Sequence, residues 1–289
     1  MTWFYLALLC AFSLALADAF SKKYFPAASS YSVLIARLCI PGLMLLPFSL
    51  YFSLPHIPVE LWLYMLLLMP LEVFAMWLYI KAIQAAPLHL TLPYLAFTPM
   101  FNILTGYMFL NEMITWDGLL GICLIVSGAY ILNIDKLTGS WRSVLEPMLA
   151  VLKINGSRWM LIVAVIYSFT SVLSKDAMSY TKPEIFGAFY YSFIGVILLV
   201  ILLLWKREAI REVTLRPRAY GLVGLFMATM VVTHFIAIAQ VEVAYMIAVK
   251  RTSLLFGMLL GAWMFRDMSF RQHLPAGIMM LSGVFFILL

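Results

Sequence analysis

The sequence predicts an all-α polytopic membrane protein with ten transmembrane helices, arranged as two inverted five-helix repeats. First, 65% of its 289 residues are hydrophobic and only 11% are charged, which is far outside the range of soluble domains. Second, apolar segments of bilayer-spanning length recur as far as Leu289, so we expect the first to be a span and not a signal peptide. Third, the order of several motifs in the first half returns in the second.

The length criterion identifies the individual helices. A hydrocarbon core of about 30 Å requires about 20 apolar helical residues, because every backbone polar group must be satisfied within the segment. Connections are short except at 134–157 and at the basic loop 206–218. The expected helices span residues 2–21, 31–52, 60–81, 90–110, 116–133, 158–177, 185–205, 219–240, 245–265 and 273–289.

Prolines lie inside three of these segments. Pro41 and Pro47 fall in 31–52, Pro70 falls in 60–81, and Pro93 and Pro99 fall in 90–110. Proline removes a backbone hydrogen bond and kinks a helix. The second half lacks counterparts at those positions, so we expect the two halves to bend unequally.

Motifs that recur in the same order divide the chain into two repeats, 1–133 and 158–289. FNILTGYMFLNEM (101–113) aligns with FGMLLGAWMFRDM (256–268). Because five is an odd number, a five-helix repeat enters the membrane in the opposite direction from its twin, as in alternating-access carriers. The matched pairs are Phe101 with Phe256, Gly106 with Gly261, Glu112 with Asp267, Met113 with Met268, Ser127-Gly128 with Ser282-Gly283, and Asp18-Ala19 with Asp176-Ala177.

The linker at 134–157 contains one further periodic stretch. In SWRSVLEPMLAVLK the apolar residues share one helical face, which predicts a helix lying flat at the membrane interface. Pro147 interrupts this pattern, so a linker with incidental periodicity is the alternative.

Lysine and arginine are distributed unevenly between the connections. Those after the odd-numbered segments hold fourteen, including the run at 206–218, and the opposite side holds only Lys175 and Lys182. The positive-inside rule then places the odd connections in the cytoplasm and both termini outside. We therefore expect a protein of the plasma (inner) membrane.

Lys250 and Arg251 stand near the start of an apolar segment. A charged side chain near the bilayer centre costs at least about 2.5 to 3.5 kcal/mol, so one that persists usually faces a wet cavity. Lys250 lies about 9 Å into its helix at 1.5 Å per residue, and Arg251 points about 100° away from it. We expect one of them to bind substrate and the other to pair with an acid; Lys250 could instead snorkel to the interface.

Three further charges lie within the expected spans. Arg37 is near the middle of 31–52, where either Asp18 or Glu72 could neutralise it. Glu72 is the best candidate for a proton-binding or cation-binding group, with ion pairing to Arg37 as the alternative. Asp18, near the end of its segment, could be only an interfacial charge beside Lys22.

The remaining candidates are uncharged or lie at a turn. His234 is a possible proton relay, although such a residue is more often a hydrogen-bonded core residue. Glu242 could cap the segment that begins at 245. Tyr245 could stack on a substrate, but most aromatic residues in such a chain serve packing or the interfacial belt.

The sequence lacks the motifs that are typical of several classes of enzyme and metal-binding protein. The sequence has no Walker loop, no HExxH, no GxSxG, and no Cys or His pair with metal-ligand spacing. We expect no cofactor, no metal and no enzymatic activity. Cys10, Cys39 and Cys123 lie in apolar segments, so disulfides are not expected. The net charge of +6 reflects orientation and not nucleic-acid binding.

The segments TLPYLAFTPMFNILTGYMFLNEMITWDGLLGICLIVSGAYIL and LSGVFFILL resemble the end of the EamA repeat of the drug/metabolite transporter superfamily. The resemblance covers nearly the whole chain as two five-helix units. It implies a ten-helix carrier that moves small organic solutes through a central cavity lined by both halves.

Three shorter segments give a narrower likeness. SKKYFP (21–26), SKDAM (174–178) and VKR (249–251) resemble the segments in which organic phosphate and triose-phosphate translocators hold phosphate. This likeness implies phosphate ligands at Lys22 or Lys23, Lys175, Lys250 and Arg251. Asp176 departs from the pattern, because a second lysine is expected there.

These observations favour a secondary carrier for a small anionic or zwitterionic metabolite, in its sharpest form an organic phosphate exchanged for another anion. The alternative within transport is a proton-coupled exporter of amino acids or amphipathic drugs. A lipid flippase or a lipid-modifying enzyme is the alternative from another class. We expect a monomer or homodimer whose partners are a small-molecule substrate and membrane lipid. The candidate substrate ligands are Lys250, Arg251, Lys175, Lys23, Arg37 and Tyr245, and the candidate coupling or ion-pairing residues are Glu72, Asp18 and His234.

Overall fold

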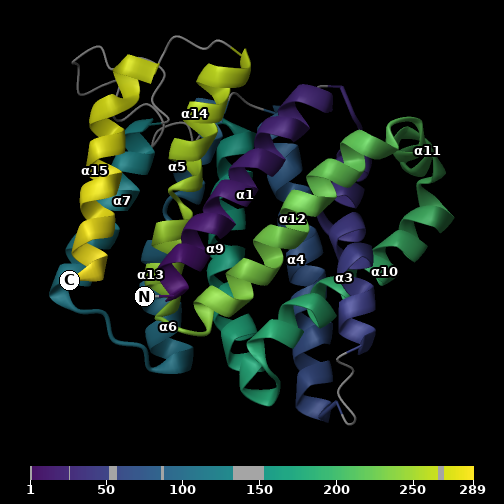
Figure 1. The fold of residues 1–289 in the computed structure, drawn as a ribbon, viewed down its shortest axis with the longest axis horizontal. Coiled ribbons are helices and arrows are strands. Elements are labelled where there is room, and N and C mark those ends of the chain that lie inside the picture. Colours follow the sequence, from purple (N-terminus) through teal and green to yellow (C-terminus); the bar gives the residue numbers. More distant parts are fainter. Residues whose placement is uncertain (1, 26, 52–56, 86–87, 133–152, 266–269) are drawn as a thin grey trace.

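A computed structural model describes residues 2–25, 27–51, 57–85, 88–132, 153–265 and 270–289. The described part is helical and contains no strand, and the chain forms one layered bundle (Figure 1). The elements are α1 (Thr2–Tyr24), α2 (Ser30–Leu34), η1 (Ile35–Cys39), α3 (Ile40–Tyr51), α4 (Val59–Ala85), α5 (Leu88–Leu95), α6 (Thr98–Leu110), α7 (Trp116–Leu132), α9 (Asn155–Ala177), η2 (Met178–Tyr180), α10 (Pro183–Trp205), α11 (Arg207–Leu215), α12 (Pro217–Ile238), α13 (Val243–Lys250), α14 (Ser253–Phe265) and α15 (Phe270–Leu288).

Each of the ten predicted segments corresponds to a helix or to consecutive helices. In the described part, seven helices are long and apolar enough to cross a membrane. The apolar helix α7 is shorter, as is the apolar stretch Leu274–Leu288 of α15. The possible interfacial helix at 141–152 lies outside the described residues. The protein is therefore an all-α polytopic membrane protein, as predicted.

Two predicted helices are interrupted, and this corrects the prediction of continuous helices at 90–110 and 245–265. The first is split into α5 and α6, and the second into α13 and α14. Every boundary of the second pair lies 155 residues after the corresponding boundary of the first, and the same spacing separates Phe101 from Phe256. The two interruptions therefore occupy equivalent positions in the two repeats.

Threonine hydroxyls satisfy carbonyl groups at both interruptions. Thr98 Oγ1 donates to the Leu95 carbonyl at 2.7 Å, and Thr252 Oγ1 donates to the Val249 carbonyl at 2.7 Å. A helix end leaves carbonyls without partners, and in a membrane such groups must be satisfied by protein. The local sequence thus supplies the groups that make each interruption tolerable.

Helices of one repeat pack against helices of the other, and equivalent helices make equivalent contacts. Helix α1 packs on α12, and its counterpart α9 packs on α4, the counterpart of α12. Helix α7 packs on its own counterpart α15 (Figure 1), and α3 packs on its counterpart α10. A two-fold axis between the repeats produces this pattern of contacts.

The contact between α7 and α15 shows that the repeats are inverted. A Cβ added to Gly121 would lie 2.6 Å from the Gly283 carbonyl oxygen, and one added to Gly128 would lie 2.8 Å from the Ala276 carbonyl oxygen. Residue numbers rise along α7 as they fall along α15, so these equivalent helices are antiparallel. Small residues allow this close approach of helix backbones in a membrane.

The basic loop at 206–218, which the sequence predicts to be a connection, contains the helix α11. Its Ala209 is buried and its arginines are exposed. Glu212 of α11 accepts hydrogen bonds from the Ser29 backbone N–H at 3.1 Å and from the Ser32 hydroxyl. The amphipathic pattern of REAIREVTL permits a helix that lies against the bundle, and Glu212 ties it to the start of α2.

Candidate functional site: a cationic cavity between the repeats

A cavity of about 730 Å³ lies between the two halves of the molecule. Helices α1, α4, α9, α10, α12, α13 and α14 all contribute to its wall. Lys22, near the end of α1, and Gln84, near the end of α4, line it and are exposed, so the cavity opens at that end. We call this end of the bundle the basic face, because α11 also packs there.

Lys250 and Arg251 both line the cavity, at the interruption between α13 and α14. Arg251 is 7% exposed, and its buried Nε has no hydrogen-bond partner among the residues that the structure describes. Neither side chain forms an ion pair with a described residue. Within the described part of the chain, the expected pairing of one of them with an acid is not seen. In a continuous helix the side chains of Lys250 and Arg251 would point in different directions. Because α13 ends at Lys250, both side chains reach the same wide cavity.

Arg37 and Asp18 form an ion pair on the same wall. The Arg37 side chain is 5% exposed and that of Asp18 is 40% exposed. Arg37 lies in the π-helical turn η1, and its guanidinium carbon is 5.6 Å from the centre of the Tyr79 ring. Of the two acids that could neutralise Arg37, the structure selects Asp18, so this cation is already compensated and Asp18 is not merely interfacial.

Glu72 and His234 also face the cavity. Glu72 is not in salt-bridge contact with any described residue, but it lies near Thr170 and Tyr191 and within electrostatic range of Lys250. His234 Nδ1 is buried without a hydrogen-bond partner among the described residues. Besides the paired Asp18, the wall thus carries a carboxyl group whose neighbours are hydroxyl groups and an imidazole whose Nδ1 lacks a described partner.

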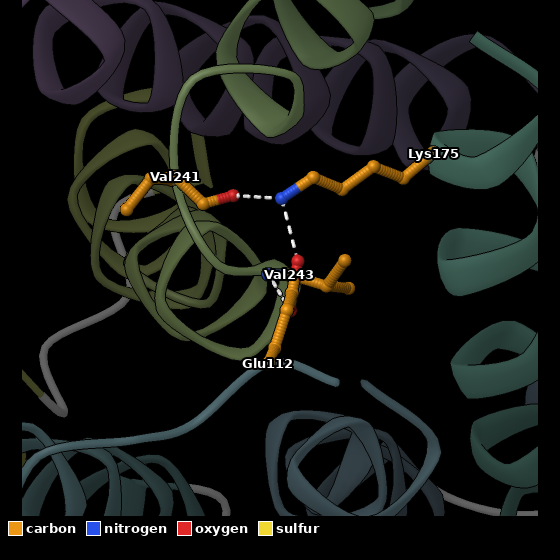
Figure 2. Close-up of polar contacts among 4 residues, drawn as sticks. All are labelled: Glu112, Lys175, Val241 and Val243. Carbon is orange, nitrogen blue, oxygen red and sulfur yellow. Dashed lines mark hydrogen bonds and ion pairs between the residues drawn. The ribbon is translucent and has the colours of Figure 1, made fainter. Parts of the chain in front are cut away.

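Three predicted ligands do not reach the cavity wall. Lys175 pairs instead with Glu112 (Figure 2). Lys23 is exposed, with its amine 5.6 Å from the centre of the Tyr24 ring.

Tyr245 faces away from the cavity for a packing reason. Its hydroxyl accepts a hydrogen bond from the Thr115 backbone N–H at 3.0 Å. Gly118 leaves the space that this ring fills, because a Cβ there would lie 2.0 Å from the Tyr245 hydroxyl oxygen. Tyr245 therefore joins α13 to the start of α7 and is not available for stacking on a ligand.

A group of polar side chains on α9 was not predicted from the sequence. Thr170, Ser171 and Ser174 line the cavity together with Tyr167. The signal was present, since α9 with η2 has a mean hydropathy of 1.4, against 2.5 for α10. Polar residues at helical spacing within a span of low hydropathy indicate a wetted face.

Residues 1–134 and 154–289 each match the family described as EamA-like transporter family. The chain belongs to the EamA-like transporter family. This membership confirms the resemblance to the drug/metabolite transporter superfamily and makes the chain an integral membrane protein. The likeness to phosphate translocators stays a prediction.

Two individual similarities accompany this family match. The EamA-like chain is 28% identical over 187 residues to an uncharacterized transporter of Methanothermobacter thermautotrophicus, covering 64% of this chain and 52% of that protein. The match thus spans about half of the relative's length. A solved structure described as a crystal structure of a protein has a TM-score of 0.68 at 15% identity, and the similarity covers 98% of this chain and 94% of the other. At that identity the likeness concerns the fold alone.

Proposed function

We propose that this chain is a secondary transporter that carries a small anionic or zwitterionic metabolite by alternating access. The observation that carries the proposal is the pair Lys250 and Arg251, which line a cavity between inverted repeats without forming an ion pair to any described residue. A buried cation without a partner is costly, and an anionic ligand would compensate it. We expect a carrier and not an enzyme.

The cavity fits a small organic anion in size and in polar groups. Its volume of about 730 Å³ lies within the range of small-molecule sites. Three buried atoms on its wall have no hydrogen-bond partner in the described segments: the Arg251 Nε, the Tyr190 hydroxyl and the His234 Nδ1. Because buried polar groups normally have hydrogen bonds, these atoms favour a polar ligand. An organic phosphate, exchanged for another anion, is the sharpest form of the proposal.

The opening at the basic face gives the proposed orientation. The positive-inside rule favours a cytoplasmic position for that face, and this supports an inward-open state of a plasma-membrane carrier as part of the proposal. Both termini would then lie outside.

Transport by purified protein in proteoliposomes tests this function. Uptake of radiolabelled inorganic phosphate should require phosphate or a phosphorylated metabolite inside the vesicles. Lys250→Ala should lower uptake by about 10- to 100-fold, because a charge-assisted hydrogen bond contributes about 1.5 to 3 kcal/mol. The exposed Lys182 at the start of α10 provides a matched control, and Lys182→Ala should leave uptake unchanged.

Other outcomes would contradict the anion proposal. A screen of thermal stability identifies the ligand class, since a compound that binds only the folded state raises its stability. If lipophilic cations stabilise the protein and phosphorylated compounds do not, or if Lys250→Ala retains full uptake, the cationic cavity does not bind the substrate.

A proton-coupled exporter is the second candidate, and Glu72 favours it. This carboxyl group faces the cavity without a salt-bridge partner in the described part of the chain. Uptake that depends on a pH gradient, needs no counter-anion and is lost in Glu72→Gln would support this alternative.

A further inference from the structure

Three segments meet at the end of the bundle opposite the basic face. The Thr2 side chain, at the start of α1, donates to Gln240 after α12 at 2.5 Å, whereas the cavity opens beside Lys22 at the other end of α1. Lys175 in the last turn of α9, Glu112 after α6 and the turn between α12 and α13 lie at this closed end (Figure 2).

One lysine and one glutamate join these segments. Lys175 Nζ donates to Glu112 Oε1 at 2.6 Å and to the Val241 carbonyl at 2.6 Å. Glu112 Oε2 accepts from the Val243 backbone N–H at 2.8 Å. The Lys175 and Glu112 side chains are only 21% and 11% exposed, so this pair is screened less than an ordinary surface pair.

The backbone before Glu112 directs its side chain to this place. Asn111 ends α6 in the left-handed conformation with φ of 53°, and its N–H bonds the Gly106 carbonyl. A Cβ on Gly106 would lie 3.0 Å from Glu112 Oε2. The sharp turn and the small residue at 106 together allow the carboxylate to reach across to the other repeat.

The pair connects the two repeats and holds a helix that carries the cavity cations. Glu112 belongs to the first repeat, whereas Lys175, Val241 and Val243 belong to the second. Val243 begins α13, and α13 ends at Lys250. A carboxylate at a helix N-terminus is also favoured by the helix dipole.

A second contact across the repeats lies at the same end. The Tyr64 hydroxyl of α4 donates to the Asp176 carboxylate, beside Lys175 in sequence. Ser174 lines the cavity one residue before Lys175 and is 4% exposed. The Glu112–Lys175 pair therefore lies directly beyond the closed end of the cavity.

We infer that Glu112 and Lys175 form the lock of a gate: their ion pair keeps this face closed while the basic face is open, and it separates when the cavity opens to the opposite side. The inference rests on the proposed alternating access. A state that opens on this face must part α6 from α9 and α13, and the lock favours the closed state by the free energy of its charged contacts. Lys175 then acts on access and not as a phosphate ligand.

Accessibility of a cysteine behind the lock tests the inference without knowledge of the substrate. Ser174→Cys is introduced after Cys10, Cys39 and Cys123 have been replaced, and a membrane-impermeant thiol reagent is added from either face. Glu112→Gln should raise the labelling rate from the lock face at least about tenfold and lower it from the basic face, as a shift between two states requires. Lys175→Gln should do the same.

The control is Asp117→Asn, which removes an exposed carboxylate at the start of α7, close in sequence to Glu112. It should not change either rate. If Glu112→Gln raises labelling equally from both faces, the pair only stabilises the fold. If it changes neither rate, there is no lock.

A cross-linked variant covers the case in which the single variants fold poorly. Glu112→Cys with Lys175→Cys, joined by a short cleavable thiol cross-linker, should block anion exchange, and cleavage should restore it. Exchange that continues in fully cross-linked protein would overturn the inference.

These outcomes are separable from those of the transport proposal. If no anion is transported but Ser174→Cys labelling shifts as expected, the lock stands and the substrate class is wrong. If Lys250→Ala abolishes exchange while labelling is unaffected by Glu112→Gln, the substrate site stands and the lock is wrong. Lys175→Gln that weakens phosphate binding without changing access would return Lys175 to the role of ligand.

Discussion

Individual charges in this bundle are distinguished by whether the protein itself compensates them. Arg37 has Asp18, and Lys175 has Glu112. Lys250 and Arg251 have no acidic partner among the described residues, although Arg251 is almost completely buried. Since an uncompensated buried charge is the costly case, the unpaired cations point to a ligand and the paired ones to structure or gating.

The Arg37–Asp18 pair gives a prediction at this scale. Asp18→Ala should lower the free energy of unfolding by about 1 to 3 kcal/mol, less than for a fully buried pair because Asp18 is partly exposed. The readout is the midpoint of thermal unfolding in detergent. Adding Arg37→Gln to Asp18→Ala should recover part of the loss, because no buried charge then remains unpaired. Glu60→Gln, at an exposed acid of α4, is the control, and an equal effect there would contradict the role of the pair.

At the scale of elements, interrupted and closely packed helices define the architecture. The α5–α6 and α13–α14 interruptions occupy equivalent positions, and the second presents Lys250 and Arg251 to the cavity. Interrupted helices at corresponding positions of inverted repeats are where carriers place their binding sites. The close contact of α7 with α15 joins the last helices of the two repeats.

Glycine substitutions test the contact between α7 and α15. Gly121→Ala should lower the free energy of unfolding by about 1 to 3 kcal/mol, because the added methyl would meet the Gly283 carbonyl and overpacking costs this much. Gly221→Ala on α12 is a matched control, since a Cβ there meets nothing within 4 Å. It should be neutral or slightly stabilising, because alanine favours helix more than glycine does. Equal unfolding midpoints for the two variants would contradict the close approach.

At the scale of the whole molecule, the described residues form an inverted pair of repeats around a cavity that opens at the basic face. Both chain ends lie at the lower left of the view in Figure 1. The two ends of the bundle differ. At the closed end, polar contacts join the two repeats. At the basic face, the helix α11 is hydrogen-bonded to the start of α2. The described state is therefore asymmetric although the repeats are related by a two-fold axis.

Sidedness is the prediction at this scale. In intact cells, a cysteine replacing the exposed Glu60 at the start of α4 should react with an impermeant thiol reagent. A cysteine replacing the exposed Arg211 of α11 should react only after permeabilisation. The reason is the excess of Lys and Arg at the basic face. The reverse pattern would show that the cavity opens outside in the described state.

The sequence by itself determined the fold class, the repeat and which charged residues lie within the apolar segments. Segment length follows from bilayer thickness, and inversion follows from an odd number of helices. The spacing of 155 residues between Phe101 and Phe256 also separates the two helix interruptions, although the sequence predicts a continuous helix at both places. These features depend on local composition and periodicity, which sequence carries directly.

Only the tertiary structure decided how those charges are used. The choice of Asp18 over Glu72 as the partner of Arg37, the separation of Lys175 from the cavity and the packing of Tyr245 on Gly118 all depend on residues far apart in the chain. A helical position specifies the direction of a side chain, but its partner is specified by which helix lies opposite. That pairing arises from the packing of the two repeats on each other, and no local pattern encodes it.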